Sequence, residues 1–375
     1  MNIKIIKGNI PLEEYPWHKE IDKLLEWLKD KPLSMRAFCF DIVMSLAYID
    51  ATAGIEKYIQ FCHSCPEPYN SHLGFINLCS PCYEKNDTWV YQKATKPQSG
   101  ALGKLSSEII LRFIYKLSEN LEKVFTVGGV EVADAALYHK DGTVILAEVK
   151  SAPLITYPVL FSIKSNSEKK HENINLTSSQ LKNAESALYL HNKIYLPLGK
   201  VGNPLWPFQD AIHFLVSKEN FSTVNGAYQT WLEAKSSYTS KNKDSKLYYL
   251  ANASGTPPNI AKTRDGWPAK ESISDSKTSA GMDRTDDIKK GIYQTLKIGA
   301  NYKKDHPNLK TALISNLPAY RHGEDYVSPF LDMLWGHEAE LENLSGVSCI
   351  KRENLRRVFD YIITLEDPVL RDIKL

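Results

Sequence analysis

The sequence lacks several features that would assign it to a familiar class of protein. It has no apolar run of about 18 residues, so it predicts no transmembrane helix. The apolar stretch near the N-terminus is too short for a secretory signal. Six cysteines in 375 residues are too few for a disulfide scaffold, and we therefore expect a reducing, cytoplasmic setting.

The chain also lacks a surplus of charge and two nucleotide-binding motifs. Lysine and arginine number 46 against 44 aspartates and glutamates, so an anionic partner would have to be attracted by local basic clusters. There is no Gly-x-x-x-x-Gly-Lys motif and no Gly-x-Gly-x-x-Gly motif after a strand. The sequence therefore gives no indication of ATP-driven or dinucleotide-dependent chemistry, and we expect no nucleotide cofactor.

Patterning along the chain predicts three regions. Residues 1–100 carry apolar side chains at helical spacing and are expected to form a helical region. Residues 101–325 alternate between helix and strand patterns, which is typical of an α/β core. A polar stretch at about 235–285, rich in Ser, Lys and Asn, is interpreted as an insertion. Residues 326–375 are predicted to be a C-terminal helical region.

Within the α/β region the expected elements follow from apolar periodicity. The pattern predicts a helix at 105–121, extended structure within 123–139, and a strand at 143–150. It also predicts a helix from Thr177 through Leu188 and a strand at 208–216. A later helix at 285–303 precedes a strand at 310–317.

Four cysteines form two Cys-x-x-Cys pairs separated by thirteen residues: Cys62, Cys65, Cys79 and Cys82. Two such pairs can complete a closed tetrahedral thiolate site, for which structural Zn²⁺ is the default ion and iron the alternative. Two disulfides and free buried thiols are the competing interpretations. The site can present residues to a nucleic acid or a protein, or it can serve as a scaffold.

A second group of residues combines two carboxylates with a lysine. Asp134 precedes an Asp-Gly turn signal, and Glu148 and Lys150 lie two residues apart on the strand that follows. Alternation along a strand places Glu148 and Lys150 on one face, and a hairpin brings Asp134 beside Glu148. Converging carboxylates need a cation, and Mg²⁺ suits them. We expect desolvation and the metal to lower the pKa of Lys150. The competing interpretation is an exposed edge strand, but the apolar run before Glu148 favours a central one.

Asp134 followed by Glu148-Val149-Lys150 resembles the core motif of the PD-(D/E)XK nuclease superfamily, with Ala133 in place of the proline. The resemblance implies a restriction-endonuclease-like mixed β-sheet flanked by helices, elaborated here by the helical N-terminal region with its four-cysteine metal-binding insertion. It implies Mg²⁺ held by Asp134, Glu148 and the Val149 carbonyl, with Lys150 and the additional acidic residue Glu108 also catalytic. The implied reaction is hydrolysis of phosphodiester bonds.

The preferred hypothesis is a site-specific endonuclease for double-stranded DNA, resembling type II restriction enzymes and, by resemblance, homodimeric. Six polar side chains are candidate DNA contacts: Lys289, Lys290, Gln294, Lys262, Arg264 and Gln180. The same residues also suit plain solvent-exposed surfaces. Two alternatives stay open: a structure- or modification-dependent nuclease of repair or phage defence, and a non-catalytic zinc-containing protein that binds nucleic acid.

Overall fold

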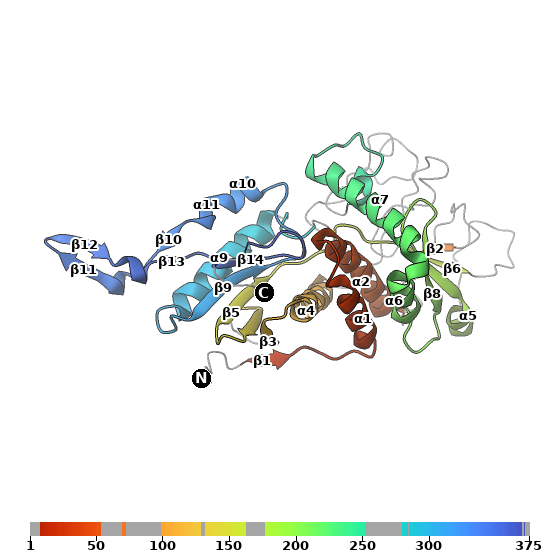
Figure 1. The fold of residues 1–375 in the computed structure, drawn as a ribbon, viewed down its shortest axis with the longest axis horizontal. Helices are drawn as coiled ribbons and strands as arrows, with labels where there is room; N and C mark the ends of the chain where they lie inside the picture. The colour runs from red at the N-terminus through yellow and green to blue at the C-terminus, as the bar shows by residue number, and fades with distance from the viewer. Residues whose placement is uncertain are drawn as a thin grey trace. The chain divides into compact units, whose positions relative to one another are not determined.

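The computed structural model describes residues 8–53, 70–72, 99–128, 132–162, 177–251, 280–283, 285–369 and 371 (Figure 1). The fold is mixed α/β, as the sequence predicted. The chain forms two compact units, each assembled from separate segments. Unit 1 consists of Met1–Glu13, Ser107–Ala152 and Gly281–Leu375, and unit 2 consists of Glu14–Ser106 and Pro153–Ala280. This division differs from the domain boundaries predicted near residues 100 and 325.

Unit 1 is built on a six-stranded mixed sheet. Its strands follow the spatial order β1 (Asn9–Pro11), β3 (Leu121–Val127), β4 (Ala135–His139), β5 (Val144–Val149), β9 (Leu309–Ile314) and β14 (Tyr361–Ile363). The pairs from β1 to β5 are antiparallel, whereas β9 runs parallel to both β5 and β14. Helix α4 (Ser99–Leu117) precedes β3, and α9 (Thr285–Tyr302) precedes β9.

The hairpin between β4 and β5 turns at Asp141-Gly142, as predicted. Gly142 has a φ of 90°, a conformation that glycine adopts without a steric penalty. The His139 N–H donates to the Thr143 carbonyl at 2.9 Å, and the Asp141 carboxylate accepts the Thr143 N–H at 2.8 Å. All six residues of β5 are buried. Strand β5 therefore lies in the interior of the sheet between β4 and β9, as its continuous apolar run indicated.

Helix α9 packs against β5 and β9. Its buried Ile288 and Ile292 join an apolar cluster with Leu313 of β9. A Cβ atom at Gly291 would lie only 2.8 Å from Leu313 Cδ1. Glycine at this position thus allows the helix to lie close to β9.

Unit 2 combines a four-stranded antiparallel sheet with helices. The sheet order is β2 (Asn70–His72), β6 (Val159–Ser162), β7 (Glu185–Tyr189) and β8 (Tyr195–Lys200). The helices are α1 (His18–Leu28), α2 (Leu33–Ala53), α5 (Ser178–Asn183), α6 (Phe208–Val216) and α7 (Phe221–Thr239), with short 3₁₀ turns at Lys218–Asn220 and Tyr248–Leu250. Packing joins α1 to α6, α6 to β8 and α2 to α7.

A buried carboxylate links three parts of unit 2. Asp41 of α2 is fully buried. It accepts hydrogen bonds from the backbone N–H groups of Leu154 and Ile155 at 3.0 and 2.9 Å, and from Trp231 Nε1 at 2.7 Å. These donors solvate the carboxylate in place of water, so burial of its charge is tolerated.

The segment at residues 328–357, which we call the arm, belongs to unit 1. It follows α10 (Gly323–Tyr326) and comprises α11 (Ser328–Leu331), β10 (Leu334–Trp335), a 3₁₀ turn at Glu338–Glu340, β11 (Leu341–Leu344), β12 (Val347–Ile350), a 3₁₀ turn at Arg352–Asn354 and β13 (Arg356–Arg357). Strand β10 pairs with β13, and β11 pairs with β12. Figure 1 shows β11 and β12 extending away from the six-stranded sheet.

Three elements differ from the sequence-based expectations. Residues 208–216 form α6 rather than a strand, and Leu188 lies in β7 rather than in a helix. The region 326–375 contains mostly short strands, so the predicted C-terminal helical region is wrong. In each case the apolar pattern was compatible with helix or strand, and tertiary packing or strand pairing decided the outcome. None of the described helices is long and apolar enough to cross a bilayer.

Candidate active site

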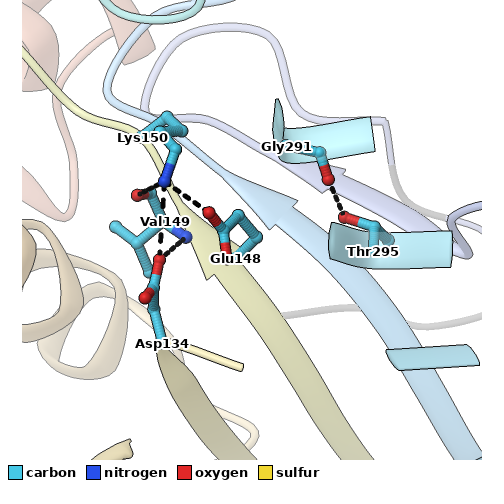
Figure 2. A network of polar contacts seen from close by, with 6 residues as sticks. All are labelled: Asp134, Glu148, Val149, Lys150, Gly291 and Thr295. Carbon is cyan, nitrogen blue, oxygen red and sulfur yellow. Dashed lines mark hydrogen bonds and ion pairs between the residues drawn. The ribbon is translucent and has the colours of Figure 1, made fainter. Parts of the chain in front are cut away.

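The predicted acidic residues and lysine meet where β4 begins and β5 ends (Figure 2). Asp134 lies directly before β4. Its backbone N–H donates to the Ala147 carbonyl at 2.9 Å, and its carbonyl accepts the Val127 N–H at 2.9 Å. These bonds continue the antiparallel ladder by one residue, so Asp134 lies opposite Glu148. The juxtaposition of the two residues predicted from the hairpin is therefore present.

The ammonium group of Lys150 connects the oxygen atoms of this cluster. Lys150 Nζ forms an ion pair with Glu148 Oε1 and lies 3.8 Å from Asp134 Oδ2. It also donates to the Val149 carbonyl at 3.4 Å. Asp134 Oδ2 accepts the Val149 backbone N–H at 3.0 Å (Figure 2). One cation thus approaches all three oxygen groups that the sequence predicted as magnesium ligands.

Strand β9 and the residues after it hold the end of β5 in place. The Lys150 N–H donates to the Ile314 carbonyl at 2.8 Å. Asn316, which is fully buried, accepts the Ala152 N–H at 3.0 Å and donates to the Ala152 carbonyl at 2.7 Å. These contacts fix the backbone on the C-terminal side of the lysine, so its side chain is presented by a rigid strand end.

Glu148 is held in an unfavourable environment for a carboxylate. Its exposed fraction is 5%. Burial, and then the neighbouring Asp134 carboxylate, raise the pKa of Glu148 from 4.5 to about 7, although Lys150 acts in the opposite direction. A carboxyl with this pKa is partly protonated near neutral pH. Strong perturbation of this kind is typical of functional sites.

The pKa of Lys150 shifts upward. Burial lowers it, but the Glu148 carboxylate and its hydrogen bond raise it, and Asp134 and Asp287 add to that effect. The expectation of a lowered pKa assumed a bound metal ion; without one, three carboxylates outweigh desolvation and the pKa of Lys150 rises. Lys150 remains a cation here and can stabilise negative charge rather than act as a base.

Asp287 is a member of the site that sequence reasoning missed. It lies in the first turn of α9, where an acidic residue is ordinarily explained by the helix dipole. Its carboxylate is close enough to Lys150 to raise the pKa of that lysine. The packing of α9 on β5 produces this proximity, and no local sequence signal indicates it.

The donor set of the cluster fits a hard divalent cation. Two carboxylates and a backbone carbonyl are the oxygen ligands that Mg²⁺ accepts, with water completing its shell. The ammonium of Lys150 now supplies the positive charge among them. Among the residues that the structure describes, no group of three or more His, Cys, Asp or Glu side chains forms a metal-binding cluster. Any Mg²⁺ site here would therefore depend on the two carboxylates, the carbonyl and water.

Glu108 lies on α4 and is 6% exposed. Helix α4 is a different element from the strands that carry the cluster, and the catalytic role of Glu108 remains a prediction. The pattern Asp134, Glu148 and Lys150 is the part of the predicted site that the structure brings together.

The predicted DNA contacts on α9 have different surroundings. Lys289 lies over the ring of Tyr326, with Nζ 5.1 Å from the ring centroid. Lys290 is exposed, and Tyr293 beside it has an exposed fraction of 61%. Gln294 is half-buried, and its Oε1 is buried without a hydrogen-bond partner. A basic and aromatic surface on α9 is therefore available to an anionic partner at Lys290 and Tyr293.

Gln180 has a structural role in unit 2. Its side-chain oxygen accepts the Thr177 N–H at 3.0 Å, and the Thr177 hydroxyl accepts the Gln180 N–H at 3.2 Å. This capping box begins α5, which confirms the predicted helix start. The remaining predicted residues lie outside the described part of the chain: Cys62, Cys65, Cys79, Cys82, Lys262 and Arg264.

Comparison of the chain with protein families, with curated proteins and with solved structures finds no significant match.

Proposed function

We propose that this protein is a Mg²⁺-dependent endonuclease that hydrolyses phosphodiester bonds in double-stranded DNA, with a restriction-endonuclease-like fold of the PD-(D/E)XK type. The observation that carries the proposal is the convergence of Asp134, Glu148 and the Val149 carbonyl on one cation, Lys150 Nζ. A structural strand end has no need to place the buried Glu148 carboxylate beside a second carboxylate.

The order of elements in unit 1 supports the same proposal. Helix α4, strands β3, β4 and β5, helix α9 and strand β9 follow one another in the helix–strand–strand–strand–helix–strand order of that superfamily. The parallel pairing of β5 with β9 across α9 also agrees with this order. Residues 153–280 leave the sheet between β5 and α9 and form part of unit 2.

Each residue of the cluster has a separate task in the proposed reaction. A bound Mg²⁺ would polarise the scissile phosphate and lower the pKa of a coordinated water. Asp134 and Glu148 would hold the ion, and an ion beside Glu148 would favour its ionised form. Lys150 carries the positive charge that stabilises developing negative charge on the phosphate. Its raised pKa keeps it protonated for that task.

The exposed α9 surface at Lys290 and Tyr293 suits contact with the DNA backbone. A lysine pairs with phosphate oxygens and contributes affinity that depends on salt, whereas base contacts provide specificity. Site-specific cleavage is part of the proposal through the resemblance.

The test combines cleavage with a direct measurement of metal binding. Purified protein is incubated with unmethylated phage DNA with and without Mg²⁺, and the wild type should produce discrete bands only with the metal. Asp134→Asn and Lys150→Met should abolish cleavage while DNA binding is retained. Glu122→Gln, which changes an exposed carboxylate on β3, should leave cleavage intact. Cleavage retained in both Asp134→Asn and Lys150→Met would contradict the proposal.

Thermal unfolding provides a second readout that needs no substrate. Mg²⁺ should raise the unfolding temperature of the wild type, because a ligand that binds only the folded state stabilises it. The increase should disappear in Asp134→Asn and persist in Glu122→Gln. A non-catalytic binding protein would show no such metal dependence at this cluster. Intact DNA combined with Mg²⁺ stabilisation would instead direct attention to a modified or branched DNA substrate.

A further inference from the structure

Ser315 directly follows β9 and is fully buried. Its backbone N–H donates to the Ile363 carbonyl at 2.9 Å. Its hydroxyl oxygen, in contrast, is shielded from solvent and has no hydrogen-bond partner among the residues that the structure describes. A buried hydroxyl without a partner has lost its bonds to water and gained none in return. Such a group needs an explanation, and the position of Ser315 in the sheet supplies one.

The strand register places Ser315 beside Lys150. Val149 of β5 is opposite Ile314 of β9, and the two strands are parallel. The Lys150 N–H donates to the Ile314 carbonyl at 2.8 Å, so the pairing continues for one residue beyond β5 and sets Lys150 next to Ser315. Neighbouring strands lie about 4.8 Å apart, a spacing that the long side chain of a lysine can span.

Ser315 and the acidic cluster lie on the same face of the sheet. Leu313 of β9 is opposite Glu148 and shares an apolar cluster with Ile288 of α9. Alternation along β9 directs Leu313 and Ser315 to one face. Alternation along β5 does the same for Glu148 and Lys150, so all four side chains are on the face that α9 covers.

Helix α9 adds a negative charge next to this lysine. The last turns of α9 lie near the start of β9, where Ile298 packs with Leu309, so its first turn lies near the end of β9. Asp287 belongs to that first turn and is half-buried, and it raises the pKa of Lys150. Lys150 therefore has oxygen atoms on two sides: those of the cluster towards β4, and the hydroxyl of Ser315 on β9.

Lys150 and a divalent cation compete for the same oxygen atoms. The ammonium approaches Asp134, Glu148 and the Val149 carbonyl, which are the ligands proposed for Mg²⁺ (Figure 2). Two positive charges repel each other strongly in a partly buried site. Occupation by Mg²⁺ therefore displaces the ammonium, which still needs acceptors for its N–H groups. A largely buried ammonium without acceptors would be costly.

We propose that Ser315 is a positioning residue for Lys150 in the metal-bound state, an inference that rests on the proposed function. With Mg²⁺ in the cluster, one N–H of the Lys150 ammonium donates to Ser315 Oγ. The other N–H groups are then left for the scissile phosphate. Asp287 keeps a negative charge near the ammonium in both positions. The hydroxyl of Ser315 gains its partner in this state, and Lys150 stays at the site.

The variant Ser315→Ala separates this role from a structural one by two measurements without DNA. Calorimetric titration with MgCl₂ should show binding about tenfold weaker than in the wild type, because the displaced ammonium loses an acceptor. In urea without divalent metal, the variant should be at least as stable as the wild type, because no hydrogen bond is lost. A serine that matters only for the fold would give the reverse pattern.

Ser45→Ala is the matched control in unit 2. Ser45 is also buried, but its hydroxyl donates to the Asp41 carbonyl at 2.8 Å and accepts the Tyr157 N–H at 3.0 Å. Its replacement should lower stability in urea, because these bonds are lost. The affinity for Mg²⁺ should be the same as in the wild type.

A double-mutant cycle tests whether Ser315 acts through Lys150. In the Lys150→Met background, Ser315→Ala should cause no further change in Mg²⁺ affinity, because the side chain that it positions is already absent. An equal loss of affinity in both backgrounds would overturn the inference.

Unchanged Mg²⁺ affinity in Ser315→Ala would also overturn the inference, and so would a loss of stability in the absence of metal. These outcomes leave the proposed function intact if the wild type cleaves DNA with Mg²⁺. A wild type that binds no Mg²⁺ would overturn both. Weaker Mg²⁺ binding in Ser315→Ala together with intact DNA would support the role of Ser315 and contradict only the nuclease activity.

Discussion

Replacing Glu148 by glutamine should change how the stability of the protein depends on pH. The pKa of Glu148 rises from 4.5 to about 7 in the folded protein, so the folded state binds this proton more tightly than the unfolded chain. At 1.36 kcal/mol per pH unit, the shift corresponds to roughly 3 kcal/mol. Protonated Glu148 therefore stabilises the folded state of the wild type fully below pH 4.5. This contribution to the free energy of unfolding is lost as the pH rises towards 7. Glutamine does not titrate and abolishes this loss.

Urea unfolding at several pH values between 5 and 8, in buffer without divalent metal, measures the effect. The free energy of unfolding of Glu148→Gln minus that of the wild type should grow with pH by about 2–3 kcal/mol. Titrating groups that do not interact with Glu148 cancel in this difference, and Glu122→Gln controls for loss of an exposed carboxylate. A difference that does not vary with pH would refute the argument that burial and Asp134 destabilise the ionised form of Glu148.

Three further predictions concern other parts of the chain. Asp41→Ala should destabilise unit 2 by about 3 kcal/mol or more, because it leaves three buried N–H donors without an acceptor. Amide hydrogen exchange at Leu154 and Ile155 should become faster. Unchanged exchange rates would contradict the role of Asp41. Lys303→Met breaks the buried ion pair with Asp360, in which Lys303 Nζ lies 2.7 Å from Asp360 Oδ2. It should lower the free energy of unfolding in urea by about 3–5 kcal/mol. The control Lys351→Met, at an exposed position, should leave stability unchanged, and equal effects of the two variants would contradict the importance of burial. Elemental analysis should find about one zinc per chain, lost on replacing Cys62 and Cys79 by serine, and a folded protein without metal would refute the four-cysteine site.

The central part of the candidate site could be predicted because it depends on local rules. Alternation along β5 and the Asp-Gly turn are enough to bring Asp134, Glu148 and Lys150 together. The contribution of Asp287 could not be predicted, because it arises only when α9 packs on β5. For the same reason the upward pKa shift of Lys150 in the absence of a metal could not be predicted, because the number of nearby carboxylates is a tertiary property.

The general α/β character of the chain was predictable, but several elements were not. The spacing of Leu181, Ala184 and Leu188 fits a helix, yet Leu188 lies in a strand that pairs with β6 and β8. Local propensity was overridden there by sheet pairing. The division into two units could not be predicted from the sequence either, because each unit joins segments that are distant in the sequence. Strands β11 and β12 of the arm contain no buried residue, so they have no apolar face towards a core from which to predict them.

The insertion of residues 153–280 between β5 and α9 has a consequence for synthesis on the ribosome. Strand β5 needs β9 as its neighbour, and the Lys150 N–H needs the Ile314 carbonyl. The ribosome reaches β9 only after about 160 more residues, which takes roughly 10–30 s at ordinary elongation rates. During this interval the growing chain carries Glu148 and Lys150 on an open edge without their supporting strand. The cluster is completed late in translation, so under the proposed function an incomplete chain would lack a finished active site.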